Sequence, residues 1–184
     1  GIAEGTTREI AILSRVGKPV CFQITALEES EGVLRPRLSR RRAQQAALDA
    51  MLAGLHPGCI LPAVVTHLES FGAFVDIGCG VPSLIGIENI SVSRIPHPDQ
   101  RFRVGQAIFA VVQELDPKLG RVYLTHRELL GTWAENAAQF SPGMTVSGCV
   151  RGIKDYGAFV ELTPNLSGLA KLRGDLRDGD RVSV

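Results

Sequence analysis

An internal repeat limits what this chain of 184 residues can fold into. The stretch ESFGAFVDIG, which begins at Glu69, returns 85 residues later as KDYGAFVELT, which begins at Lys154. A third, partial copy lies upstream, because the segment from Val16 echoes the segment from Val104. Self-similarity at a nearly constant spacing predicts a chain that is built from copies of one small unit.

Each unit is a run of short alternating segments separated by turn signals, which is typical of a small all-β barrel. Two other stretches, RRRAQQAALDAMLAGL and RELLGTWAENAAQF, space their apolar residues as helices do, and we expect them to be linkers. The predicted fold is therefore all-β, with tandem five-stranded barrels, short helical linkers and incomplete terminal repeats. In the central copy we expect strands near residues 59–68, 71–77, 82–86, 106–115 and 121–126. The expected boundaries are 1–45 for the end of a first repeat, 46–55 for a linker, 56–129 for a complete repeat, 130–140 for a second linker and 141–184 for a partial repeat.

Charge and composition exclude several classes of function. The formal net charge is only +1, so binding to an anionic polymer would depend on local patches. The cysteines (Cys21, Cys59, Cys79 and Cys149) include no close pair, which argues against a metal cage or a disulfide framework. No nucleotide loop, serine-hydrolase elbow or zinc-protease motif occurs, and no apolar run reaches the ~18 residues of a membrane span. We expect a cytoplasmic protein without catalytic residues, cofactor or metal.

The repeated aromatic residues are the first candidates for a binding surface. Strict alternation along FGAFVDIG places Phe74 on the outer face of the barrel, and a bulge at Gly72 could turn Phe71 to the same side. Tyr156 and Phe159 repeat the arrangement. Outward aromatic side chains form a platform on which unpaired bases stack. The alternative is that they cover an apolar patch or pack against a neighbouring domain.

The run that starts HPGCILPAVV and ends YLTHREL closely resembles the S1 (S-one) RNA-binding domain. That domain is the OB-fold repeat of bacterial 30S ribosomal protein S1, and it also occurs in polynucleotide phosphorylase and other RNA enzymes. The motif FGAFV with the glycines after it, and the ending VGQ…D…GRVYLT, carry the resemblance. It covers residues 57–128 completely and 142–184 in part, while residues 16–42 match the last two strands of a preceding copy. It implies OB-fold barrels with RNA across their second, third and fifth strands.

The resemblance also implies particular RNA-binding residues in the central copy. The two aromatics correspond to Phe71 and Phe74, a turn acid to Asp116, and a following basic residue to Arg121. Arg121 can contact a phosphate or stack on a base. Asp116 can orient Arg121 or accept a hydrogen bond from a base amine, or it is only the first residue of a turn.

Three further positions follow from the same resemblance. The family often has a histidine on the third strand, and this chain has Gly86 there, which weakens the inferred site. In the last copy the matching residue is Lys171, which can reach a phosphate. His67 lies on the first strand, where the family often has a basic or polar group. It either lines the groove or is simply an exposed histidine.

The stretch RPRLSRRR holds five arginines at the junction between the first repeat and its linker. One interpretation is a ramp that contacts phosphates and leads RNA between domains. The others are a solvated helix face, or a contact with ribosomal RNA that does not read sequence. The RNA-binding candidates in this stretch are Arg40, Arg41 and Arg42.

Taken together, these features predict binding of single-stranded RNA by tandem S1 domains, in support of mRNA binding in translation. The small ribosomal subunit is a candidate partner, and no membrane is involved. Two alternatives stay open: the RNA-gripping region of a larger RNA-processing enzyme, and an OB-fold module that docks on the ribosome or on a protein. The near-zero charge of the central unit and Gly86 favour the docking module.

Overall fold

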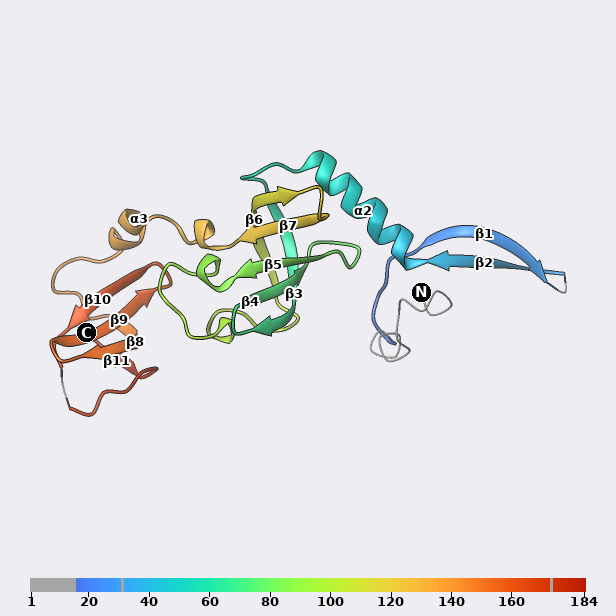
Figure 1. Cartoon of the computed structure of the whole chain (residues 1–184). Helices are drawn as coiled ribbons and strands as arrows, with labels where there is room; N and C mark the ends of the chain where they lie inside the picture. Colours follow the sequence, from blue (N-terminus) through green and yellow to red (C-terminus); the bar gives the residue numbers. More distant parts are fainter. Residues whose placement is uncertain (1–15, 31, 173) are drawn as a thin grey trace.

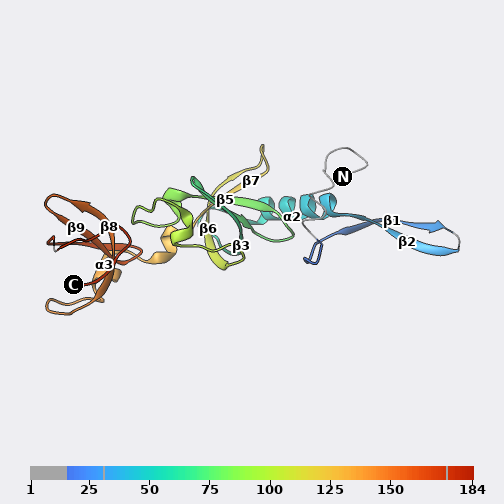
Figure 2. The same ribbon diagram turned by 90° about the horizontal axis from the view of Figure 1, so that it is seen from below.

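Three β modules follow one another along the chain in the computed structural model, which describes residues 16–30, 32–172 and 174–184 (Figure 1). The first is a hairpin of β1 (Gln23–Ser30) and β2 (Val33–Ser39). A barrel and a smaller sheet follow, and the view from below shows the same order (Figure 2). Residues 1–15, which we expected to belong to the first repeat, lie outside the described residues.

The central module is a closed barrel of five strands, as the sequence predicted. Neighbours pair in the order β3-β4-β5-β7-β6, with β6 returning to β3; the β5–β7 pair is parallel and the others are antiparallel. Small aliphatic side chains such as Val65, Ala73, Val75 and Leu124 fill its core. Alternate residues of each strand face this interior, and their small size suits a tight barrel. The strands are β3 (Ile60–Glu69), β4 (Gly72–Asp76), β5 (Pro82–Gly86), β6 (Ala107–Asp116) and β7 (Arg121–Thr125), with 3-10 turns at η1 (Ile87–Asn89) and η2 (Pro98–Gln100).

A helix, α2 (Arg40–Gly54), connects the hairpin to the barrel. It begins at Arg40, earlier than the linker we expected at 46–55, because Ser39 acts as its N-cap and accepts a hydrogen bond from the backbone nitrogen of Arg42 at 3.2 Å. Leu48 and Met51 pack against the barrel core. The helix is therefore part of the central module rather than a free spacer.

A bulge shapes the β3–β4 pair, but it is not where we predicted it. The register shifts between Val65 and His67, so Thr66 is the extra residue, on β3 and not at Gly72. Gly72 has another role. A Cβ atom there would collide with the carbonyl oxygen of Ile85 and lie 3.2 Å from the Cα atom of Gly86. Only glycine lets β4 approach β5 this closely.

The C-terminal module is a four-stranded sheet in the order β10-β9-β8-β11. A 3-10 turn, η3 (Arg127–Leu130), and the short helix α3 (Trp133–Ala137) lead into it. Hydrogen bonds from Thr132 hold the pKa of the Glu135 carboxyl below its ordinary value and close a capping box. The strands are β8 (Ser147–Lys154), β9 (Gly157–Thr163), β10 (Leu166–Ala170) and β11 (Arg181–Ser183). None of the helices within the described ranges has the length and apolar character needed to cross a membrane.

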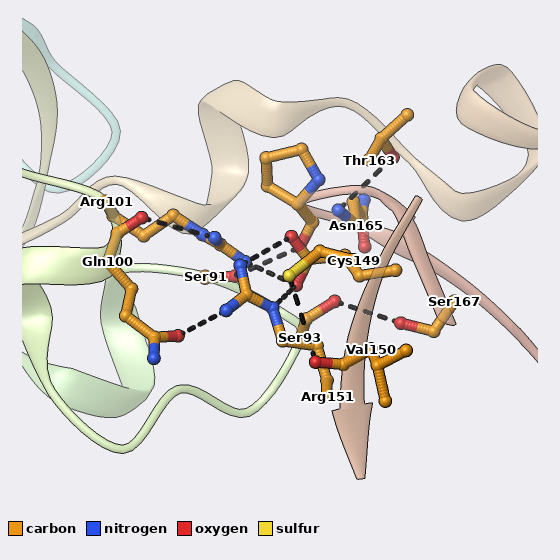
Figure 3. A network of polar contacts seen from close by, with 12 residues as sticks. Ser91, Ser93, Gln100, Arg101, Cys149, Val150, Arg151, Thr163, Asn165 and Ser167 are labelled. Carbon is orange, nitrogen blue, oxygen red and sulfur yellow. Dashed lines mark hydrogen bonds and ion pairs between the residues drawn. The ribbon is translucent and has the colours of Figure 1, made fainter. Parts of the chain in front are cut away.

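A buried ionic cluster joins the barrel to this sheet (Figure 3). The Glu161 carboxylate accepts hydrogen bonds from Arg101 Nη2 at 2.5 Å and from Arg151 Nε at 3.1 Å. Only 7% of the Glu161 side chain is exposed, with 12% for Arg101 and 18% for Arg151. Arg151 Nη1 also donates to Gln100 Oε1 at 2.7 Å. Separation of the barrel from the sheet would leave buried charges without their partners, so each module stabilises the other at this junction.

Polar contacts beside the ionic cluster extend the junction. The carbonyl oxygen of Pro164 accepts hydrogen bonds from Ser91 Oγ at 3.0 Å and from the backbone nitrogen of Ser93 at 3.2 Å. Thr163 Oγ1 donates to Asn136 Oδ1 at 2.9 Å, so α3 is also fixed to the sheet. The junction therefore consists of directed hydrogen bonds, which specify one relative orientation of the two modules.

Replacing Gly72 with alanine should destabilise the barrel by about 1–3 kcal/mol, because the added methyl group overpacks the β4–β5 approach. Urea unfolding followed by circular dichroism measures the change. Gly54→Ala is the control: a Cβ there meets nothing within 4 Å, and we expect no loss of stability. Equal unfolding curves for G72A and wild type would contradict the close approach.

Glu161→Gln should weaken the junction by about 3 kcal/mol, because two arginines lose the carboxylate that compensates their burial. Fluorescence of the single tryptophan, Trp133 in α3, follows the unfolding of this region in urea. Glu28→Gln is the matched control. Its exposed ion pair with Arg37, at 3.5 Å, should contribute no more than about 1 kcal/mol. Equal effects of the two substitutions would show that the junction is not held by the buried cluster.

Candidate nucleic-acid interface

The strand register places four side chains in a row across the outer face of the barrel. His67 on β3 lies opposite Phe74 on β4, Phe74 opposite Leu84 on β5, and Leu84 beside Tyr123 on β7. The His67 and Phe74 rings are stacked, with centroids 6.4 Å apart and planes at 29°. Phe71 contacts Phe74 edge to face, with centroids 6.0 Å apart. The structure thus brings together three sequence-predicted residues, His67, Phe71 and Phe74.

An apolar groove of about 560 Å³ runs beside this row. Phe74, Leu84 and Tyr123 line it from the barrel, and Arg121 stands at the turn between β6 and β7. Its wall includes Leu48 of α2, whose Cδ2 atom would lie 3.2 Å from a Cβ at Gly120. The connecting helix is therefore part of the groove, which is large enough for a planar ring.

A second hollow of about 320 Å³ shares Leu84 and Tyr123 with the groove, so the concave surface continues along the barrel. It is more polar, and both Glu88 and Glu114 line it. Gly86, where the family often has a histidine, also borders it, and the Glu88 carboxylate fills the space that a side chain at Gly86 would need. This end of the surface offers carboxylate acceptors, which suit base amino groups rather than phosphates.

Arg121 and Asp116 lie opposite each other at the ends of β7 and β6. Asp116 Oδ1 accepts a hydrogen bond from the backbone nitrogen of Leu119 at 2.9 Å, so this carboxylate closes the turn, as the simpler interpretation of Asp116 held. A hydrogen bond with Tyr123 raises the pKa of Arg121 above its ordinary value, and the charge of Asp116 adds a smaller effect. Arg121 therefore keeps its positive charge, and it lies beside the Tyr123 side chain.

The arginines of the first turn of α2 lie apart from the row. Arg40 is half-buried and its Nη2 atom approaches Gly80 in the β4–β5 loop, whereas Arg41 and Arg42 are exposed. None of the residues in that turn is acidic. Three cations at the positive end of a helix dipole are electrostatically unfavourable. An anionic partner at this end of the helix would offset that cost.

The C-terminal sheet repeats the aromatic pair. The Tyr156 and Phe159 rings lie edge to face with centroids 6.3 Å apart, nearly the same geometry as in the barrel. Leu169 faces Phe159 across β9 and β10, as Leu84 faces Phe74. Lys171 is exposed just beyond β10. A counterpart of β7 is not found among residues 141–172 and 174–184, so this second surface has no equivalent of Tyr123 there.

Sequence reasoning missed three residues of the groove and misplaced one. Tyr123 and Leu84 are absent from the predicted site, although alternation along RVYLT and PSLIG points both side chains to the outer face. Leu48 gives no signal, because its place depends on how α2 docks. Alternation along RVYLT would place Thr125 on the outer face, but Thr125 is buried and donates a hydrogen bond to the carbonyl oxygen of Asn89 at 3.3 Å.

The chain is similar to known proteins in two ways. The family described as the S1 RNA binding domain matches residues 55–127. Small ribosomal subunit protein bS1 of Leuconostoc lactis is 36% identical over 163 residues, which are 80% of this chain and 38% of that protein. Its counterpart in Neisseria meningitidis serogroup B is 31% identical over 158 residues, 83% of this chain and 28% of that protein. The chain thus spans less than two fifths of the length of these relatives.

The chain is also similar to solved structures, and one example follows. The solution structure of GSP13 from Bacillus subtilis is 22% identical and covers 47% of this chain and 73% of that chain, with a TM-score of 0.40.

Proposed function

Residues 55–127 are an S1 RNA binding domain, in a chain related to bacterial protein bS1 over about four fifths of its length, and we propose that this chain binds single-stranded RNA. The binding surface is the outer face of β4, β5 and β7 together with the wall that α2 adds. The observation that carries the proposal is the row of His67, Phe74, Leu84 and Tyr123 beside an apolar groove.

Stacking accounts for the preference for single strands. Bases on an aromatic platform contribute ~1–3 kcal/mol each, with little dependence on base identity. In a duplex the faces of the bases are stacked on one another, so duplex RNA should bind less well than single strands. Phe74 and Tyr123 offer two ring surfaces along the groove, and Arg121 can pair with a phosphate or stack on a base. The site therefore favours unpaired RNA without demanding one sequence.

Electrostatic attraction comes from local groups because the net charge is only +1. Arg40, Arg41 and Arg42 lie at the start of the same helix that carries Leu48, so RNA leaving the groove along α2 would meet these cations. The Tyr156 and Phe159 pair offers a second weak site, and linked weak sites raise the overall affinity. Binding should weaken as salt rises.

Our proposal includes a wider role, in mRNA binding during translation and in association with the small ribosomal subunit. The relatives are small ribosomal subunit proteins of which this chain spans only a part. A chain that acts in this way needs no catalytic site and would work in the cytoplasm.

A docking module for the ribosome or a protein is the second candidate. The observation that favours it is Glu88, whose carboxylate occupies the space beside Gly86 and makes that end of the surface acidic. Such a surface would repel phosphates there. Two properties distinguish the candidates. Only RNA binding should weaken as salt rises, and only RNA binding should prefer single strands over duplex.

Replacing both Phe74 and Tyr123 with alanine should weaken single-stranded RNA binding by at least tenfold, since two stacked bases at ~1–3 kcal/mol each lose their platforms. Fluorescence anisotropy of a labelled oligonucleotide, measured over a salt series and against duplex RNA, gives the affinities.

Phe109→Ala is the matched control, because Phe109 is an aromatic on β6 that is 62% exposed and does not line the groove. We expect wild-type affinity for this variant. If the double variant also bound like wild type, the barrel face would not be the RNA site, and the docking module would be favoured.

Leu48→Ala should weaken RNA binding several-fold by opening the α2 wall of the groove. Leu52→Ala separates this effect from stability, because Leu52 packs on the barrel core without lining the groove. Both variants should lower the free energy of unfolding, by less than the about 2–5 kcal/mol of a fully buried leucine because both side chains are half-buried. Only L48A should lose affinity for the RNA. Similar affinities of the two variants would exclude α2 from the binding surface.

A further inference from the structure

Two cysteines that are far apart in the sequence meet in the fold. Cys21 precedes β1, and Cys79 lies in the loop between β4 and β5. Both are exposed free thiols, and both line one small cavity of about 240 Å³. Arg40 and Gly80 border the same cavity. Sequence spacing suggested no cysteine pair, but the segment before β1 lies beside the β4–β5 loop of the barrel and creates one.

The backbone of Cys79 is in a conformation that its side chain disfavours. Its φ angle is 53°, and it is the single non-glycine residue with positive φ among the residues that the structure describes. Gly78 and Gly80 on either side also have positive φ, at 125° and 77°. An L-residue is strained in this region, whereas glycine is not. A cysteine between two glycines here is a local conflict of the kind that accompanies function.

The β4–β5 loop is held in place, so the position of Cys79 is defined. Asp76 Oδ1 accepts hydrogen bonds from the backbone nitrogens of Gly78 at 2.8 Å and Gly80 at 3.1 Å. From α2, Gln44 Nε2 donates to the carbonyl oxygen of Gly80 at 2.5 Å. The loop is therefore tied to the start of the helix that continues from the hairpin, and both thiols are anchored near this joint.

The surroundings assign different roles to the two sulfurs. A hydrogen bond with Cys21, loss of hydration and the charges of Cys21 and Asp76 raise the pKa of the Cys79 thiol above its ordinary value. Because the thiolate is the nucleophile, this shift assigns the second step of the reaction to Cys79 and the first step to Cys21. The Arg40 guanidinium borders the cavity, and its buried Nε atom has no hydrogen-bond partner among the described residues.

We propose that Cys21 and Cys79 are a redox-sensitive pair, which hydrogen peroxide converts to a disulfide that fastens the N-terminal hairpin to the barrel. The Cys21 thiolate attacks one peroxide oxygen, the O–O bond breaks, and hydroxide departs. The product on Cys21 is a sulfenic acid. The Cys79 sulfur then attacks the Cys21 sulfur, the S–O bond breaks, and the oxygen departs as water with the Cys79 proton. The two sulfurs lose two electrons, which the peroxide oxygens gain.

This crosslink would fix the joint at the start of α2, and the same helix supplies Leu48 to the groove. Oxidation would therefore act on the hairpin and the helix without touching the aromatic row. The pair is a property of the fold and does not depend on whether the groove binds RNA.

The test treats the reduced 184-residue chain with hydrogen peroxide at a stoichiometric amount and then blocks the remaining thiols with N-ethylmaleimide. Cleavage after Glu28, Glu69, Glu88 and Glu135 places each cysteine in a different peptide. Mass spectrometry without reductant should find the Cys21 and Cys79 peptides joined. Two of the four thiols per chain should be lost, and dithiothreitol should restore them.

Single serine variants provide matched controls. C21S and C79S should each abolish the crosslink, whereas C59S and C149S should form it as wild type does. Cys79→Gly adds a measurement on the reduced protein: it should remove the crosslink and raise the midpoint of thermal unfolding, because glycine accepts positive φ. Crosslinks only between chains, mixed pairings among the four cysteines, or equal oxidation of all four without a disulfide would overturn the proposal.

Discussion

The register of β4 between its two neighbours is the constraint on which the rest of the barrel depends. On one side the bulge at Thr66 sets the pairing with β3, and on the other side Gly72 lets β5 come close. A slip of one residue would exchange the faces of the strand and turn Phe74 into the core. Because the register is held from both sides, the aromatic side chains remain on the outer surface and above a common groove.

The sequence predicted those parts of the fold that have a local pattern. Alternation identified the five strands and the outward direction of Phe74, and turn residues marked their ends. Prediction from the sequence failed where the structure depends on contacts between segments that are distant along the chain. The wall at Leu48 needs the docked position of α2, and the pairing of Cys21 with Cys79 needs the segment before β1 to lie beside the β4–β5 loop. The bulge was assigned to a glycine because glycine permits both bulges and close approaches, and periodicity does not distinguish the two.

Equivalent positions in the two repeats have diverged in role. Asp76 in the barrel closes its own loop by accepting from two backbone nitrogens, whereas Glu161 at the same place in the sheet is buried between two arginines of the junction. The aromatic pairs, in contrast, keep nearly the same geometry in both copies. The repeat therefore preserves its outer aromatic surface while the acid after it serves the contacts particular to each module.

The connection between hairpin and barrel has a consequence for how such chains can vary. Helix α2 is anchored at its start by the Ser39 cap and along its length by Leu48 and Met51 on the barrel. Each added residue rotates the rest of a helix by about 100° and lengthens it by about 1.5 Å. A single insertion in α2 would turn its apolar side away from the barrel. The spacing between the hairpin and the barrel is thus fixed in rotation as well as in length, unlike the spacing that a flexible linker gives.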